Sequence, residues 1–134
     1  MSTISTQVNH GIVPGIVPYY SALTITNIGG VSNSAGSYAL FGATGTVVNN
    51  GTIAESGGSS SSDSGISLSG SGSVTNSGTI SGASVGINLF AGGSITNTNS
   101  IIGSDGIGVI SASGAYAAIY IGGGVALRAA ANAP

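Results

Sequence analysis

Residues 72–80 read Gly-Ser-Val-Thr-Asn-Ser-Gly-Thr-Ile, and variants of this stretch recur along the chain. The shared pattern is apolar-x-Asn-x-Gly-x-apolar, and its asparagine falls at Asn27, Asn49, Asn76 and Asn97. These asparagines are 22, 27 and 21 residues apart, and the longest interval contains the Gly/Ser-rich stretch 57–64. Without most of that stretch the period is near 21 residues, which identifies a repeat protein.

A second short motif lies about ten residues before the later asparagines, as in Ile66-Ser67-Leu68 and Ile87-Asn88-Leu89. Its alternation of apolar and other residues is typical of a strand with one buried face. A repeat of this length with several short strands and no helical pattern has no room for a helical crossover. The sequence therefore predicts an all-β fold, a right-handed parallel β-solenoid (β-helix) of about five coils.

Stacking the repeats predicts three apolar columns in the core, which no single repeat could bury alone. The first column contains Ile25, Val47, Val74 and Ile95 and is expected to continue at Tyr116. The second contains Val31, Ile53, Ile80 and Ile101; the third contains Phe41, Leu68, Leu89 and Val109.

The asparagine column could present four amides to a ligand, but a structural turn ladder is the favoured interpretation. Asparagine bonds to nearby backbone groups at turns, and stacked amides can bond to one another along a ladder. Two residues further on, the aligned positions are Gly29, Gly51, Gly78 and Asn99. Because asparagine often replaces glycine where φ is positive, we expect a left-handed turn residue at these positions.

The composition excludes several classes of function. Charged residues make up 3% of the chain, and it has a single Lys or Arg, too little positive charge to replace the counterions of nucleic acid. There is no Cys for a disulfide or a thiolate metal site. No apolar run is long enough to predict a transmembrane helix.

Candidate catalytic groups are few. Glu55 has no obvious partner, Asp63 lies in the Gly/Ser-rich stretch, and Asp105 precedes a glycine as turn residues do. Two carboxylates that cleave a glycoside must lie roughly 5–9.5 Å apart, which these positions would meet only by chance. His10 stands alone. We therefore expect no enzyme, no cofactor and no bound metal.

The predicted solenoid spans residues 22–125, between an extended apolar segment at 1–21 and a C-terminal tail at 126–134. The solenoid ends are nearly uncharged, so they lack the charged residues that normally prevent strand edges from pairing. We therefore expect copies of the chain to associate end to end through a heterologous contact, which produces an open filament and not a closed ring. The N-terminal segment is expected to dock on the neighbouring copy. Its candidate contact residues are Ile12, Val13, Ile16, Val17, Tyr19 and Tyr20. An alternative to end-to-end association remains open. In it, the ends fold back on the solenoid as caps, or they are only boundaries within a longer passenger.

The nonapeptide at 72–80 and its variants resemble the passenger repeats of bacterial autotransporter and haemagglutinin-type surface proteins, over roughly residues 22–125. The resemblance implies a right-handed β-helix exposed at a bacterial surface or outside the cell, with roles in adhesion or biofilm.

Two functions are expected from these observations. The first is a non-enzymatic structural subunit of a surface or matrix fibre, whose partners are copies of itself. The alternative is a monomeric adhesin that binds extracellular polysaccharide or a host surface. Such a module needs an exposed aromatic cluster, and the tyrosines available for one are Tyr19, Tyr20, Tyr38, Tyr116 and Tyr120.

Overall fold

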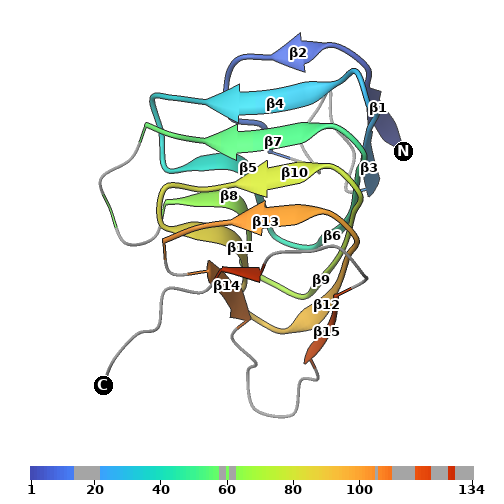
Figure 1. Ribbon diagram of the computed structural model, residues 1–134, viewed down its shortest axis with the longest axis vertical. Helices are drawn as coiled ribbons and strands as arrows, with labels where there is room; N and C mark the ends of the chain where they lie inside the picture. The colour runs from blue at the N-terminus through green and yellow to red at the C-terminus, as the bar shows by residue number, and fades with distance from the viewer. Residues whose placement is uncertain are drawn as a thin grey trace.

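The computed structural model describes residues 1–13, 22–57, 60 and 63–104, together with the backbone of strands at 106–109, 117–121 and 127–128. Every regular element in this part of the chain is a β-strand (Figure 1). The short strands suit a sequence that alternates β-branched residues with glycine and small polar residues.

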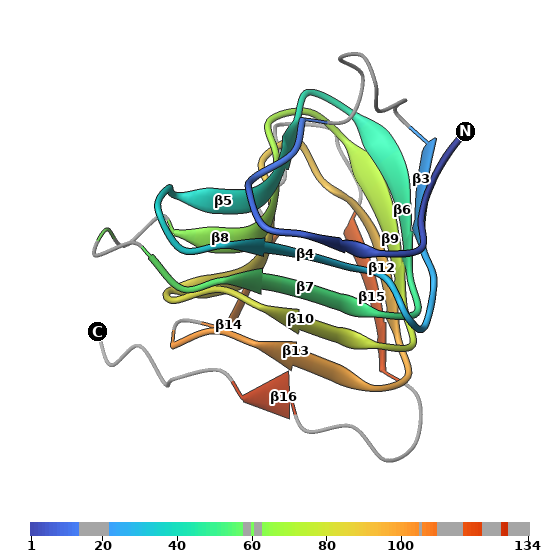
Figure 2. The same ribbon diagram turned by 90° about the horizontal axis from the view of Figure 1, so that it is seen from above.

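The strands form three parallel sheets, which surround a common interior when the stack is viewed from above (Figure 2). Sheet A contains β1 (Ser2–Ile4), β3 (Ala22–Ile25), β6 (Gly45–Asn49), β9 (Gly72–Asn76), β12 (Gly93–Asn97) and β15 (Ala117–Ile121). Sheet B contains β2 (Gln7–Val8), β4 (Gly30–Asn33), β7 (Thr52–Glu55), β10 (Thr79–Ser81), β13 (Ser100–Ile102) and β16 (Leu127–Arg128). Sheet C contains β5 (Tyr38–Gly42), β8 (Ser64–Leu68), β11 (Val85–Leu89) and β14 (Gly106–Val109).

Each coil of the chain crosses sheets A, B and C in turn and pairs in parallel with the coils before and after it. The predicted all-β fold and parallel β-solenoid are confirmed. Four coils have a strand in all three sheets, rather than about five. The period is about 22 residues, as between the paired residues Val31 and Ile53.

Residues 2–12 form a further, partial coil of the solenoid, not an extended segment beside it. β1 pairs with β3, β2 pairs with β4, and Ile12 bridges to Leu40. Ile12 uses both of its backbone groups on this coil contact: its N–H donates to the Ala39 carbonyl oxygen (2.9 Å), and its carbonyl oxygen accepts the Phe41 N–H (3.0 Å). The predicted boundary at residue 22 is therefore wrong, because the core already begins in the first coil.

The role predicted for Ile12 as a docking residue is wrong for the same reason, since its side chain is only 3% exposed. Val13 is exposed, and Ile16, Val17, Tyr19 and Tyr20 lie outside the described residues. At the other end β16 pairs with β13, which extends the solenoid past the predicted limit at residue 125.

Sheet A differs from the predicted alignment in its first repeat. Val47 pairs with Leu23, and Ile25 pairs with Asn49. Ile25 is therefore not in the column of Val47, Val74 and Ile95, where the sequence alignment placed it. A shift of two residues keeps the same side chains inward, so the apolar pattern cannot detect it. At the other end of that column, Ile119 and not Tyr116 is the register partner of Ile95.

Sheet C differs from the prediction at Phe41. Leu40 is the inward residue that pairs with Ile66. Phe41 pairs with Ser67, on the opposite face of the sheet; Phe41 is 39% exposed, whereas Ser67 is buried. The placement of Phe41 in the core is therefore wrong. Leu68 and Leu89 pair with each other and are buried, and the backbone of Val109 continues their register.

The remaining column lies in sheet B, where each member pairs with the next and is at most 1% exposed. Its members are Val31, Ile53, Ile80 and Ile101.

Candidate functional site

The corner between sheets A and B holds a ladder of buried asparagines at the ends of β6, β9 and β12. The Asn49 Nδ2 donates to the Asn76 Oδ1 (2.7 Å), and the Asn76 Nδ2 donates to the Asn97 Oδ1 (2.8 Å). The Asn76 amide also donates to the carbonyl oxygens of Gly78 (2.9 Å) and Ser100 (3.0 Å). These amides are fully buried and bonded to the protein, so they close turns and are not presented to a ligand.

Asn27 lies outside this ladder, contrary to the sequence alignment. Ile25 occupies the ladder position in its coil, between Ile4 on one side and Asn49 on the other. Asn27 is exposed in the turn that follows. The corner column is therefore apolar in its first two coils and polar in the next three.

The glycines two residues after the ladder are required for a different reason from the one predicted. Among the described residues, positive φ occurs only at Gly92 and Gly93, so the expected left-handed conformation at Gly29, Gly51, Gly78 and Asn99 is wrong. A Cβ on Gly51 would collide with the carbonyl oxygens of Gly29 and Thr26, and a Cβ on Gly78 with that of Gly51. Glycine is needed because the backbones of successive coils touch at this turn.

The corner between sheets B and C holds a second polar column, which was not predicted from the sequence. Asn33 and Glu55 end β4 and β7 and are register partners. Each accepts a hydrogen bond from the backbone two residues ahead, the Asn33 Oδ1 from the Ala35 N–H (3.1 Å) and the Glu55 Oε1 from the Gly57 N–H (2.7 Å). The available signal was their spacing, because both follow the Val31–Ile53 column by two residues.

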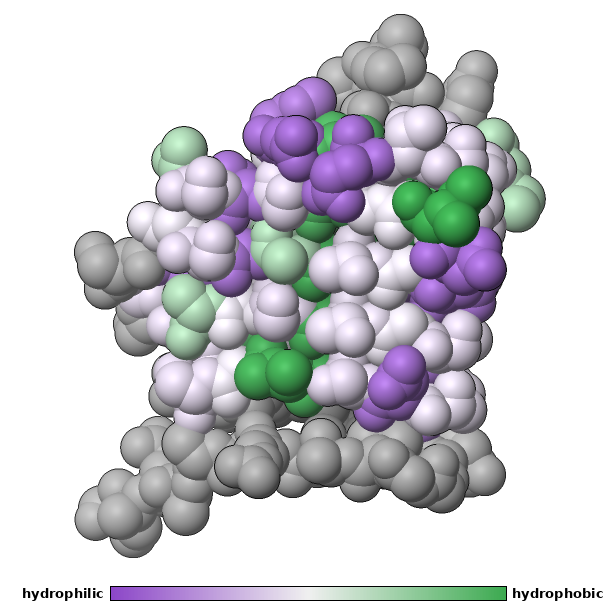
Figure 3. All heavy atoms as spheres, turned by 45° about the horizontal axis from the view of Figure 1, so that its top comes forward, coloured by the Kyte–Doolittle hydropathy of each residue, from purple (hydrophilic) through white to green (hydrophobic). Residues whose placement is uncertain are grey.

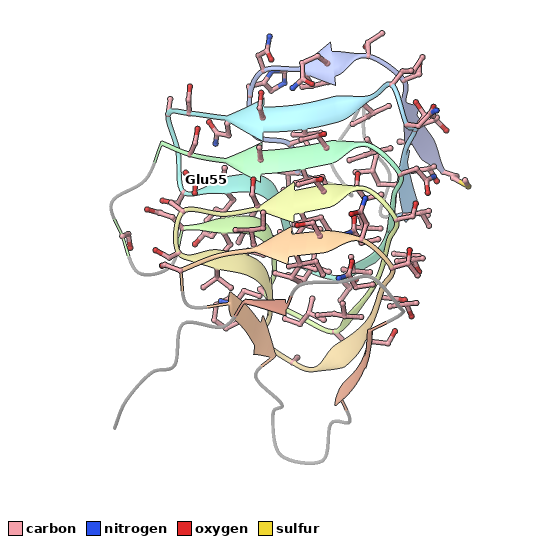
Figure 4. The ribbon with its side chains drawn as sticks, in the orientation of Figure 1. Glu55 is labelled. Atoms are coloured by element: carbon pink, nitrogen blue, oxygen red, sulfur yellow. The ribbon has the colours of Figure 1, made fainter. Side chains whose placement is uncertain are left out.

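Glu55 also links its own coil to the next one. Its Oε2 accepts the Ala83 N–H (3.0 Å), and the side chain is only 2% exposed. Figure 4 shows Glu55 at the end of β7, where the chain turns toward β8. The carboxylate therefore fastens two successive turns at this corner.

Asp63 comes immediately before β8 and is fully buried. Its Oδ2 accepts the Ser60 N–H (2.6 Å), and its backbone carbonyl oxygen accepts the N–H groups of Ser84 (3.0 Å) and Val85 (2.9 Å). The other carboxylate oxygen, Oδ1, is buried and has no hydrogen-bond partner. Glu55 and Asp63 thus both hold the turn at residues 83–85.

The acidic side chains that the structure describes lie in the interior. Glu55 and Asp63 are closed off from solvent, so a substrate could not reach their oxygens. His10 is exposed on the first coil. Within the part of the chain that the structure describes, no three His, Cys, Asp or Glu residues gather into one group that could hold a metal ion.

The outer surface has one aromatic contact of note. The rings of Tyr38 and Phe41 stack with centroids 5.0 Å apart at an interplanar angle of 28°. Phe90, which directly follows β11, is 40% exposed. On the face shown in Figure 3, residues of intermediate hydropathy dominate and strongly hydrophobic ones form separate spots. Of the tyrosines considered above, Tyr19, Tyr20, Tyr116 and the Tyr120 side chain lie outside the described residues.

Comparison of the chain with family models, curated proteins and solved structures finds no match. No helix in the described part of the chain is long and apolar enough to cross a membrane.

Proposed function

We propose that this chain is a non-enzymatic structural protein of a bacterial surface or extracellular fibre, in which solenoids join end to end. The observation that carries the proposal is the arrangement of the three sheets. β1 and β2 are the outermost strands of sheets A and B on one side, and β15, β16 and β14 are the outermost strands on the opposite side.

A parallel solenoid repeats by translation along its axis, so the last strands of one copy match the first strands of another in direction. An outermost strand presents backbone N–H and C=O groups that can pair with a further strand. Such a joint is heterologous and does not close, so it produces a filament. The resemblance of the repeats to autotransporter and haemagglutinin-type passengers supports the surface location.

The joint we propose is made by the backbone edge of the first coil, not by a docking arm. Ile4 and Ile12 in that coil are 4% and 3% exposed, so these core side chains are not available for an apolar contact with another copy. No charged side chain occurs before Glu55, and the first coil therefore lacks the lysines with which natural edge strands prevent pairing.

A lysine placed on the edge strand tests this joint. Thr3 in β1 and Thr75 in β9 are both exposed threonines in sheet A, but only Thr3 belongs to an outermost strand. We expect Thr3→Lys to abolish filaments and leave a folded monomer, whereas Thr75→Lys should assemble like the unmodified chain. Electron microscopy and sedimentation velocity over a range of concentrations measure both.

Filaments that form equally well with Thr3→Lys would rule out the proposed joint. An unmodified chain that stays monomeric at every concentration would instead favour the second candidate, an adhesin that binds polysaccharide or a host surface. The Tyr38–Phe41 pair, in which Tyr38 is half-buried and Phe41 is exposed, favours that candidate, because aromatic rings offer large contact areas at low entropic cost.

A further inference from the structure

The corner that contains Glu55 can be compared with the equivalent corner one coil earlier, which contains Asn33. There, the Asn33 Nδ2 donates to the Tyr38 carbonyl oxygen (2.6 Å). Asn33 pairs with Glu55, and Tyr38 pairs with Ser64. The register therefore places Glu55 opposite the start of β8, the strand that Asp63 precedes. The neutral amide of Asn33 in one coil is replaced by the Glu55 carboxylate in the next, where Asp63 also takes the position of Ser37.

These two carboxylates have four oxygens, and three of them accept backbone hydrogen bonds. The N–H groups of Gly57, Ala83 and Ser60 bond to the Glu55 Oε1, the Glu55 Oε2 and the Asp63 Oδ2. The fourth oxygen, the Asp63 Oδ1, is buried without a partner. A buried polar atom without a partner requires an explanation, and a bound ion is one of the few available.

The sequence of the two coils that form this corner, residues 52–85, contains no Lys, Arg or His. The single basic residue, Arg128, lies in β16, which pairs with β13 two coils beyond β7. Glu55 and Asp63 are 2% and 0% exposed, so solvent does not screen them. Buried charges in proteins are paired with an opposite charge or bind a metal, because an uncompensated one is costly.

We propose that the Asp63 Oδ1 and the carboxylate of Glu55, two residues that both bond to the turn at 83–85, bind a divalent cation of the calcium type. The side-chain ligands are all oxygens, which suit Ca²⁺ and Mg²⁺. No Cys is present and the one His lies on the first coil, so zinc is disfavoured. Ca²⁺ accepts irregular coordination, whereas Mg²⁺ demands near-octahedral geometry, and backbone carbonyls and water complete the shell. The ion would tie the start of β8 to the turn at 83–85.

Calcium binding is measured directly by isothermal titration calorimetry of the purified chain with CaCl₂, and thermal unfolding is followed in CaCl₂ and in a chelator at equal ionic strength. With two carboxylates, the dissociation constant should be on the order of 10⁻⁴–10⁻³ M. We expect one Ca²⁺ per chain and a rise in the unfolding midpoint of roughly 5 °C at about 10 mM CaCl₂. MgCl₂ at the same concentration should have a smaller effect.

Two substitutions and one control assign the effect to the corner. Asp63→Asn keeps the shape of the side chain, and Glu55→Asn copies the residue at the equivalent position of the preceding coil. Both should abolish the calcium response. In the chelator, Asp63→Asn should unfold at or above the midpoint of the unmodified chain, because it removes an uncompensated charge. Asp105→Asn removes the remaining acidic side chain of the sequence and should leave the calcium response unchanged.

A calcium response that persists in Asp63→Asn, or an unmodified chain that neither binds Ca²⁺ nor is stabilised by it, would overturn the proposal. If Asp63→Asn does not fold, Glu55→Asn decides by the same two measurements. An equal response to CaCl₂ and to NaCl of matched ionic strength would also count against a site, because it would show general screening.

Discussion

At the scale of single residues, Asn76 is the central rung of a buried hydrogen-bond ladder. Its side chain bonds to asparagines in the coils on both sides and to two turn carbonyls. Asn76→Ala would leave buried groups of Asn49, Gly78 and Ser100 without this partner. Unsatisfied buried groups cost more free energy than the lost hydrogen bond itself. We therefore expect urea unfolding to show that the free energy of unfolding falls by about 2–4 kcal/mol.

Asn27→Ala is the matched control for that loss. Asn27 follows the same sequence pattern but is exposed, so its replacement should change the free energy of unfolding by less than about 0.5 kcal/mol. Equal losses in the two variants would contradict the observed register. The ladder shows what the sequence could predict at this scale, since matching asparagines indicated a corner column. It could not show that Ile25 replaces Asn27 in that column, because both alignments bury apolar residues.

At the scale of the strand, β5 illustrates why a repeat can be recognised and still be aligned wrongly. Its sequence is Tyr-Ala-Leu-Phe-Gly, with large apolar residues at both alternating positions. Alternation alone cannot decide which of Leu40 and Phe41 points inward. The neighbouring strand decides it, because Ile66 pairs with Leu40 and Ser67 pairs with Phe41. The corner acids were missed for a related reason, because Glu55 and Asp63 are linked only through the turn at 83–85 of the next coil.

A pair of aspartate substitutions in β5 tests this assignment. Leu40 is fully buried, so Leu40→Asp places an unpaired charge in a narrow core. This substitution should lower the free energy of unfolding by about 4 kcal/mol or more. Phe41 is 39% exposed, so Phe41→Asp loses only a surface contact with Tyr38 and should cost about 1 kcal/mol. Urea unfolding of both variants measures the difference. The reverse order would restore the alignment expected from sequence, with Phe41 in the core.

At the scale of the whole molecule, each coil contacts only the coils next to it. The six-stranded ladders of sheets A and B and the four-stranded ladder of sheet C all follow this nearest-neighbour order. In such a molecule, stability is the sum of coil and interface contributions, so the number of coils can change without loss of the fold. What must be preserved is the register between the coils that come into contact.

Deletion of residues 72–92 should therefore yield a shorter but folded solenoid. Gly93 pairs with Gly72, so the deletion brings β12 into the place of β9 and keeps Ile95 opposite Val47 and Asn97 opposite Asn49. Deletion of residues 72–81 removes β9 and β10 but keeps β11, which leaves an incomplete coil without strands in sheets A and B. Circular dichroism and urea unfolding should show a cooperative β-protein of reduced stability for the first deletion and a much larger loss of stability for the second, although it removes fewer residues. Equal stability of the two deletion variants would mean that the whole coil is not the unit of this fold.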